Sequence, residues 1–329
     1  MLNGKSILVT GGTGSFGKKF IEIILKRFPD LERVIIFSRD EYKQFVMSNM
    51  PQFQDNKKLR FFVGDVRDRE RLYRAFDGVD IVIHAAALKQ VPSCEYNPFE
   101  AIKTNILGAQ NVIDAAIDRN IQKVVALSTD KACAPVNLYG ATKLCSDKLF
   151  IAGNVYAGLH ETRFSVVRYG NVAGSRGSVI PYFKELIKNG INELPITDNQ
   201  MTRFWLKLED AVEMVLMALE IMRGGELFVK KIPSMRVVDL ARAIAPQVPL
   251  KTVGIRPGEK IHEVMITRED ARNTFEFDKY FVVKPAFKCS ELDNFYKQAK
   301  KVEKNFEYHS GSNKEWLDID QMKVMLNEL

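Results

Sequence analysis

A glycine-rich turn near the start of the chain limits the fold more than any other feature. The apolar segment Ser6–Thr10 runs into Gly12-x-Gly14-x-x-Gly17, and apolar residues at helical spacing continue to Phe28. Glycines in this pattern permit a tight turn and let the backbone approach a pyrophosphate, which the following helix N-terminus favours. We expect a dinucleotide here rather than a turn with only a structural role. The residues expected to contact it are Gly11, Thr13, Gly14, Ser15, Phe16 and Gly17.

Short apolar segments alternate with amphipathic ones through the first half of the chain. The expected strands are Ser6–Thr10, Arg33–Ser38, Leu59–Val63, Asp80–His84, Lys123–Ser128 and Phe164–Arg168. The expected helices are Gly14–Phe28, Arg69–Phe76, Asn105–Asp118 and Tyr139–Ala152. Continuously apolar strands separated by helices are typical of a parallel sheet that is covered on both faces. The sequence therefore predicts an α/β fold with a doubly wound parallel sheet.

The pattern changes after Asn171, which indicates a second part of the molecule. The expected elements are a loop at Gly174–Ser178, helices at Pro181–Lys188, Leu208–Met222 and Val237–Ala245, an irregular stretch before Arg203, a strand of the first sheet at Gly225–Val229 and a turn at Arg256–Gly258. We expect a dinucleotide-binding Rossmann domain at 1–174 plus about 206–231. A smaller, discontinuous α/β domain for the substrate is expected at about 175–205 plus 232–329.

The ends of the next strands carry residues suited to the rest of the dinucleotide. An acid after the second strand commonly holds the ribose 2′-hydroxyl of NAD, whereas an arginine accommodates the 2′-phosphate of NADP. Arg39 comes first here, so we expect NADP, with a solvated loop charge as the alternative. Asp65 would lie beside the adenine or cap the following helix. The other residues expected at the cofactor are Ser38, Asp40, Lys43, Val66, Ala85, Ala86 and Ala87.

Two further segments carry groups for acid–base chemistry. Tyr139 and Lys143 lie four residues apart on one helix face, and an ammonium near a phenol lowers the pKa of the phenol. Such a tyrosine can accept a proton from a hydroxyl while hydride leaves the same carbon. The preceding strand ends in Ser128-Thr129-Asp130-Lys131, which makes an ordinary surface pair less plausible for Tyr139 and Lys143. These groups suggest oxidation of a sugar hydroxyl followed by proton removal beside the new carbonyl.

The motifs resemble the extended short-chain dehydrogenase/reductase family. Thr10–Gly17, Ser128 or Thr129, and Tyr139 with Lys143 carry the general resemblance. The segments that narrow it are Ser38–Glu41, His84–Lys89, Thr129–Ala132, Asn137–Gly140, Arg168–Val172, Met201–Phe204 and Gly254–Lys260. Together they are similar, through nearly the whole chain, to the short form of the inverting UDP-N-acetylglucosamine 4,6-dehydratases (5-epimerising) of pseudaminic acid biosynthesis. Cys133-Ala134 departs slightly from the family pattern and places no new acid or base there.

The resemblance implies a role for each acid–base group. Tyr139, assisted by Lys143, would remove the C4 hydroxyl proton as hydride passes to NADP. Lys131 would be the base at C5, which requires that its pKa be lowered, and the nearby Lys143 is a candidate for lowering it. Asp130 would protonate the departing C6 hydroxyl, which requires that its pKa be raised. Hydride return to C6 and reprotonation of C5 from the opposite face would give UDP-2-acetamido-2,6-dideoxy-beta-L-arabino-hex-4-ulose. The residue that delivers this last proton stays open.

The resemblance also implies contacts with the substrate, UDP-N-acetylglucosamine. The residues concerned are Lys89, Thr129 and Asn171 around the sugar, Arg203 and Arg256 at the diphosphate, and Glu259 at the uridine ribose. Guanidinium groups suit phosphate oxygens, although surface salt bridges are the alternative for both arginines. The family further implies the first step of pseudaminic acid synthesis for flagellin glycosylation, and homo-oligomers from dimer to hexamer.

Composition limits the partners and the location. The 329 residues carry a net charge of +7 in scattered positions, so we expect no nucleic-acid binding and interpret the charge as a solvated surface or a field that favours an anionic substrate. No apolar run is long enough to cross a bilayer and no signal peptide is evident, so we expect a cytoplasmic protein without membrane contact. Cys94, Cys133, Cys145 and Cys289 form no CxxC pair, which favours reduced thiols and no metal.

Three other functions compete with the dehydratase. A UDP-N-acetylhexosamine 4-epimerase would need Tyr139 and Lys143 but would have no use for Asp130 and Lys131. A related dehydratase/epimerase of another aminosugar pathway is poorly distinguished by the sequence. A non-enzymatic NADP-binding regulator would share the fold without turnover.

Overall fold

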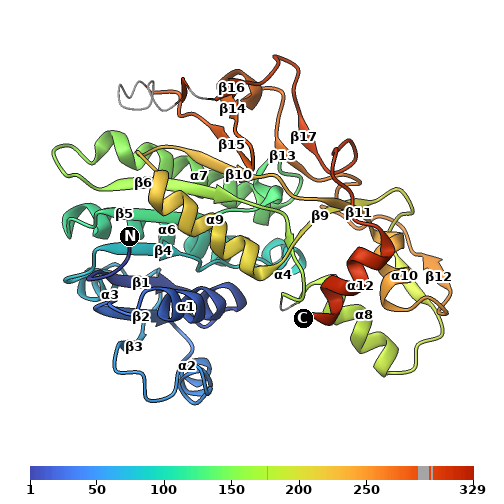
Figure 1. Ribbon diagram of the computed structural model, residues 1–329, viewed down its shortest axis with the longest axis horizontal. Coiled ribbons are helices and arrows are strands. Elements are labelled where there is room, and N and C mark those ends of the chain that lie inside the picture. The colour runs from blue at the N-terminus through green and yellow to red at the C-terminus, as the bar shows by residue number, and fades with distance from the viewer. Residues whose placement is uncertain (176, 288–295, 298) are drawn as a thin grey trace.

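The computed structural model (Figure 1) describes residues 1–175, 177–287, 296–297 and 299–329. Its largest element is a ten-stranded sheet with the order β16-β14-β15-β10-β6-β5-β4-β1-β2-β3. The strands in that order are Lys300–Lys301, Thr274–Glu276, Tyr280–Val283, Leu227–Lys230, Arg163–Arg168, Lys123–Leu127, Ile81–His84, Ser6–Thr10, Arg33–Ser38 and Leu59–Val63. Neighbours from β10 to β3 are parallel, whereas β15, β14 and β16 join antiparallel. The predicted parallel sheet is confirmed, and the strand predicted at Gly225–Val229 joins it as β10.

Helices cover both faces of this sheet. Their bounds are α1 (Ser15–Arg27), α2 (Glu41–Ser48), α3 (Arg69–Ala75), α4 (Val91–Tyr96), α5 (Pro98–Ile102), α6 (Gly108–Asp118), α7 (Leu138–Tyr156) and α9 (Leu208–Ile221), with a π-helical turn at Lys103–Leu107 and a 3₁₀ turn at Asp130–Ala132. Helices α1 and α9 pack together, as do α6 and α7, and Figure 1 shows α9 in front of the sheet with α7 behind it. Phe20, Ile21 and Ile24 are the buried side of α1, so the predicted helical spacing is confirmed.

A smaller lobe lies at one end of the molecule, where Figure 1 shows α8, α10 and α12 close together. Its elements are β7 (Asn171–Val172), β9 (Thr202–Leu206) and β11 (Ser234–Arg236) in one sheet, β8 (Leu194–Ile196) with β12 (Leu250–Thr252), β13 (Val264–Ile266) with β17 (Tyr308–His309), α8 (Val179–Lys188), α10 (Val237–Ile244), α12 (Ile319–Asn327) and a 3₁₀ turn at Asp270–Asn273. The side chains of Trp205, Met235 and Met322 are fully buried and form its core with Ile180. Burial of this apolar set holds α8, β9, β11 and α12 together.

The C-terminal third differs from the expected layout. Residues 232–329 were expected in the smaller domain, but β14, β15 and β16 extend the large sheet beyond β10. The apolar strand Tyr280–Val283 pairs with β10 and covers an edge that would otherwise be open. The stretch expected to be irregular before Arg203 contains β8 and the start of β9. Arg176 of the expected loop and Cys289 lie outside the described residues.

Two further expectations concern thiols and membranes. Cys94, Cys133 and Cys145 are free thiols. Within the described ranges, no helix combines the length and apolar character needed to cross a bilayer.

Strand register brings the ends of the parallel strands to one edge. Thr10 lies opposite both Phe37 and His84, and His84 lies opposite Ala126. The segments that follow these strands therefore meet at the carboxyl edge of the sheet, where open α/β sheets bind ligands.

Candidate active site

The glycine turn packs its backbone closely against the segment after β4 and against helix α1. Gly11 has a φ of 66°, and a Cβ there would lie 2.9 Å from Ala86 Cα. A Cβ on Gly17 would lie 2.5 Å from Gly12 O, so helix α1 starts in direct contact with the turn. Helix α1 has neither a side-chain cap nor an acidic residue in its first turn. This cradle and the uncapped helix end fit the pyrophosphate of a dinucleotide.

The groups after β2 and β3 form a charged surface beside the turn. Arg39, with 55% of its side chain exposed, lies 3.9 Å from Asp65. Burial raises the pKa of Asp65, but hydrogen bonds and charge from Arg67 outweigh it and lower that pKa. Asp40 caps α2 by accepting from Lys43 N at 2.9 Å. Helix α3 is capped by Asp68 and not by Asp65.

The remaining residues predicted at the cofactor line the same sheet edge. Ser38 is buried and accepts from Gln44 Nε2 at 3.1 Å. Val66 is also buried. The Thr10 hydroxyl accepts from the backbone N–H of Ala85 at 3.2 Å and of Ala86 at 3.3 Å, which fixes the small residues after β4 beside the glycine turn.

Tyr139 and Lys143 share the buried face of α7. Their exposures are 8% and 3%, and Asn137 caps the helix by accepting from Gly140 N at 2.8 Å. Burial raises the pKa of Tyr139 to about 12, although the charge of Lys131 and a hydrogen bond with Thr129 oppose this rise. The expectation that Lys143 lowers the Tyr139 pKa is therefore wrong for the free protein: burial dominates, and the opposing cation is Lys131. Burial also lowers the pKa of Lys143.

Asp130 and Lys131 form an ion pair at the end of β5. Asp130 is fully buried, and its Oδ1 accepts from Thr129 Oγ1 at 2.9 Å and from Lys131 Nζ at 3.1 Å. Burial raises the pKa of Asp130, which is the predicted direction for an acid. Burial alone would lower the pKa of Lys131, but the Asp130 and Glu263 carboxylates outweigh it and raise that pKa. The expected lowering by Lys143 is thus wrong.

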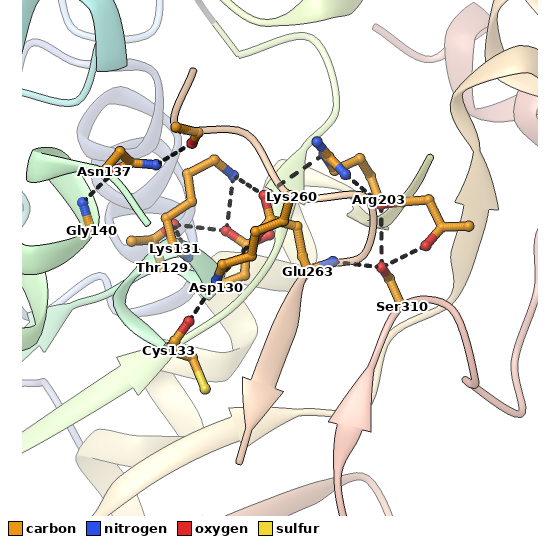
Figure 2. A network of polar contacts seen from close by, with 12 residues as sticks. Thr129, Asp130, Lys131, Cys133, Asn137, Gly140, Arg203, Lys260, Glu263 and Ser310 are labelled. Atoms are coloured by element: carbon orange, nitrogen blue, oxygen red, sulfur yellow. Dashed lines mark hydrogen bonds and ion pairs between the residues drawn. The ribbon is translucent and has the colours of Figure 1, made fainter. Parts of the chain in front are cut away.

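Three residues from the smaller lobe complete the charge network (Figure 2). Figure 2 shows Lys131, Asp130 and Glu263 pointing toward one another, with Arg203 and Lys260 beside them. Glu263 Oε1 lies 3.2 Å from Lys131 Nζ and 3.7 Å from Arg203 Nε. Lys260 Nζ lies 3.8 Å from Glu263 Oε2 and donates to Cys133 O at 2.6 Å. Sequence reasoning assigned no role to Lys260 or Glu263, although both closely follow the expected Arg256 and Glu259 contacts.

The predicted substrate contacts occupy different environments. Arg203 is buried, and its Nη1 donates to Thr202 O at 2.7 Å and to Ile261 O at 3.1 Å. Arg256 is exposed, whereas Glu259 keeps a buried Oε2 without a hydrogen-bond partner in the described part of the chain. Asn171 is half-buried at the start of β7. Burial and the charge of Lys131 lower the pKa of Lys89, which places it in the field of the same cluster.

Buried polar side chains beneath the acid–base residues hold helix α7 in place through hydrogen bonds. The sequence did not predict them. Asp147 Oδ2 accepts from Ser128 Oγ at 2.6 Å and from Arg168 Nη2 at 3.2 Å. Asn105, in the π-helical turn, donates to Leu88 O at 2.9 Å and to Thr142 Oγ1 at 2.9 Å. These contacts tie α7 to the strand ends. The described residues contain no group of three or more His, Cys, Asp or Glu placed to hold a metal ion.

The chain is similar to known proteins in both sequence and fold. The chain matches the family model described as polysaccharide biosynthesis protein over residues 7–285. It is 54% identical to a UDP-N-acetylglucosamine 4,6-dehydratase (inverting) of Campylobacter jejuni (strain 81-176), covering 99% of this chain and 98% of that protein. It is 40% identical to a UDP-glucose 4-epimerase of Rickettsia akari, with 99% and 96% covered. The crystal structure of Pen from Bacillus thuringiensis superposes with a TM-score of 0.89 at 35% identity, with 100% and 99% covered.

Proposed function

This chain belongs to the polysaccharide biosynthesis protein family and has the extended short-chain dehydrogenase/reductase fold, and on that premise we propose that it is an inverting UDP-N-acetylglucosamine 4,6-dehydratase that uses NADP. The observation that carries the proposal is the ion pair between Asp130 and Lys131, placed with Tyr139 at the ligand-binding edge of the sheet. Oxidation at C4 alone needs only the tyrosine, whereas elimination across C5 and C6 also needs an acid and a base.

The cofactor assignment rests on the cradle at Gly11 and on Arg39. A nicotinamide dinucleotide would supply the hydride acceptor for C4 and the donor for C6, so that no net redox change results. The exposed Arg39 guanidinium suits a 2′-phosphate, which favours NADP over NAD.

Tyr139 is assigned the proton of the C4 hydroxyl. Its pKa of about 12 keeps the phenol protonated in the free protein. Proton acceptance therefore requires further stabilisation of the phenolate in the complex, and the Lys143 and Lys131 ammonium groups are the available sources.

Asp130 and Lys131 are assigned the elimination of water. Transfer of one proton from Lys131 Nζ to Asp130 across their 3.1 Å contact yields a neutral amine and a carboxylic acid. Lys131 then takes the C5 proton, the C5–H electron pair forms the C5=C6 bond, and Asp130 protonates the departing C6 oxygen to release water. This step returns the pair to the charged form found in the free protein.

The substrate is held by groups on both lobes. Arg203 and Arg256 suit the diphosphate, Lys89, Thr129 and Asn171 the sugar, and Glu259 the uridine ribose. The buried free oxygen of Glu259 supports its assignment, since a hydroxyl donor would satisfy it.

The biological setting follows from the same proposal. The family resemblance in the sequence implies that the product enters pseudaminic acid synthesis for flagellin glycosylation and that the enzyme is a cytoplasmic homo-oligomer of two to six copies. The smaller lobe would form the nucleotide-sugar domain, and the parallel part of the large sheet the NADP domain.

The test is incubation with UDP-N-acetylglucosamine and NADP in D2O, followed by proton NMR. We expect a C6 methyl group, deuterium at C5 and the L-arabino 4-keto sugar. A D-xylo 4-keto product would remove the inversion. UDP-N-acetylgalactosamine without a 4-keto sugar would favour the 4-epimerase, which the Rickettsia relatives make the second candidate. Absence of any reaction would favour another nucleotide sugar or a cofactor-binding regulator.

A further inference from the structure

Glu263 is a buried acid to which the proposed chemistry gives no role. Its side chain is 3% exposed and faces three cations: Lys131 at 3.2 Å, Arg203 at 3.7 Å and Lys260 at 3.8 Å. Burial raises the pKa of Glu263, but these cations outweigh it and lower that pKa. The carboxylate is therefore charged where an isolated buried acid would be neutral.

Lys131 consequently lies between two carboxylates that belong to different parts of the molecule. Asp130 follows β5 of the large sheet, whereas Glu263 directly precedes β13, which packs against the Asp130–Ala132 turn. The two contacts to Lys131 Nζ have nearly equal lengths, 3.1 Å and 3.2 Å. Two such partners fix the amine more closely than one does, although a quarter of the Lys131 side chain is exposed.

We propose that Glu263 is a positioning residue that fixes the Lys131 amine beside Asp130 and keeps one shared proton on the Asp130–Lys131 pair. The inference rests on the dehydratase function proposed above. It assigns Glu263 no contact with the substrate, and its effect passes through Lys131.

The elimination of water requires that the Asp130–Lys131 pair hold one proton. With none, Asp130 cannot protonate the leaving oxygen; with two, Lys131 cannot accept the C5 proton. The negative charge of Glu263 raises the pKa of Asp130 and the pKa of Lys131. It therefore raises the lower and the upper limit of the pH range in which the pair holds one proton. Arg203 and Lys260 oppose this effect. Lys89, the neutral Tyr139 phenol and the Cys133 thiol are further titratable groups that interact with the pair.

The first experiment titrates Lys131 without using turnover. Trace labelling with acetic anhydride at a series of pH values, followed by mass spectrometry of the Lys131 peptide, reports the pKa of this amine. In Glu263→Gln we expect reactivity to begin about one pH unit or more lower than in the wild type. Glu263→Asp should recover part of the difference. An unchanged Lys131 titration in Glu263→Gln would overturn the proposal.

Glu226→Gln is the matched control for loss of a buried carboxylate. Glu226 is fully buried, accepts from Ser165 Oγ at 2.7 Å, and directly precedes β10 at the opposite end of the parallel strands from the site. Its replacement should lower the melting temperature without moving the Lys131 titration. A shift in this variant as large as that in Glu263→Gln would overturn a specific role for Glu263.

The second experiment measures the pH–rate profile with UDP-N-acetylglucosamine. Both limbs should move to lower pH in Glu263→Gln and return toward the wild type in Glu263→Asp. An equal loss of rate at every pH would show a merely structural role and overturn the proposal. An inactive wild type would refute the dehydratase function, whereas the labelling titration would still decide whether Glu263 controls Lys131.

Discussion

Lys131 Nζ contacts only one oxygen of the Asp130 carboxylate. It lies 3.1 Å from Oδ1, while Oδ2 is buried without a hydrogen-bond partner among the described residues. A buried carboxylate oxygen with no donor is a costly arrangement unless it is protonated or meets a ligand. A proton on this carboxyl would reduce that cost, which agrees with the raised pKa of Asp130.

Asp130→Asn is expected to stop dehydration while leaving oxidation at C4 intact. The amide cannot donate a proton to the leaving oxygen, so product formation should fall by roughly 10²–10⁴-fold. Rapid mixing with NADP should still show a transient absorbance at 340 nm.

Tyr139→Phe provides the contrast, because it should remove both the transient and the product. Asp77→Asn, at an exposed position, is the control and should behave as the wild type. Formation of product at the wild-type rate by Asp130→Asn would refute the assigned role.

Gly11→Ala should weaken NADP binding by at least about tenfold. The new methyl group would lie 2.9 Å from the Ala86 backbone and would push apart the two segments that form the cradle. Gly190→Ala is a matched control, since its φ of 74° resembles the 66° of Gly11 but its Cβ would meet no atom within 4 Å. Both should lose about 1–2 kcal/mol of stability from backbone strain. Calorimetry should show equal NADP affinity for Gly190→Ala and the wild type.

Arg39→Ala tests the choice between NADP and NAD. Loss of the guanidinium should weaken NADP binding by about tenfold or more and change NAD binding little, because only NADP carries the 2′-phosphate. Arg74→Ala, in the last turn of α3, is the control for loss of a positive charge. Equal losses for both dinucleotides would place Arg39 elsewhere than at the 2′-phosphate.

His84 should make folding less favourable in mild acid. Burial, with a smaller contribution from Lys143, lowers its pKa to about 3, so the ring is neutral in the folded protein and protonates near 6.5 when unfolded. The contribution of the neutral ring to the free energy of unfolding is complete above pH 6.5 and is lost as the pH falls toward 3. At pH 5 the free energy of unfolding is lower by about 2 kcal/mol.

His84→Gln should remove this contribution from the difference in unfolding free energy between pH 7.5 and pH 5. Urea titrations at both pH values measure it. His160→Asn, at a half-buried histidine bonded to Asn120, should leave the wild-type difference unchanged. A difference that His84→Gln does not reduce would contradict a neutral buried ring.

The parallel part of the sheet was predictable because local patterns determine it. Strands at Ser6–Thr10, Arg33–Ser38 and Leu59–Val63 match the structure residue for residue, since each contains at least three consecutive apolar or β-branched residues. The strands β14 and β15 were missed because β15 pairs with β10, about 50 residues earlier, and β14 joins the sheet through β15; no local pattern encodes the pairing with β10.

The sequence predicted which acid–base side chains lie close together but not their electrostatics. Spacing put Tyr139 and Lys143 on one face and Asp130 with Lys131 at a strand end. It could not show that Glu263, far along the chain, approaches Lys131 and raises its pKa. Nor could it show the depth of burial that sets the Tyr139 pKa, since burial depends on the packed tertiary structure.

The path of the chain between β10 and α12 also bears on how the protein unfolds. After β10 the chain builds β11 to β13 outside the large sheet, returns to it as β14 to β16, and leaves again for β17 and α12. Neither lobe can be excised as one continuous fragment, because each contains chain from both sides of the other. Trp205, buried in the core of the smaller lobe, should therefore lose its native fluorescence in the same cooperative transition as the sheet, and proteolysis should yield no stable half-molecule.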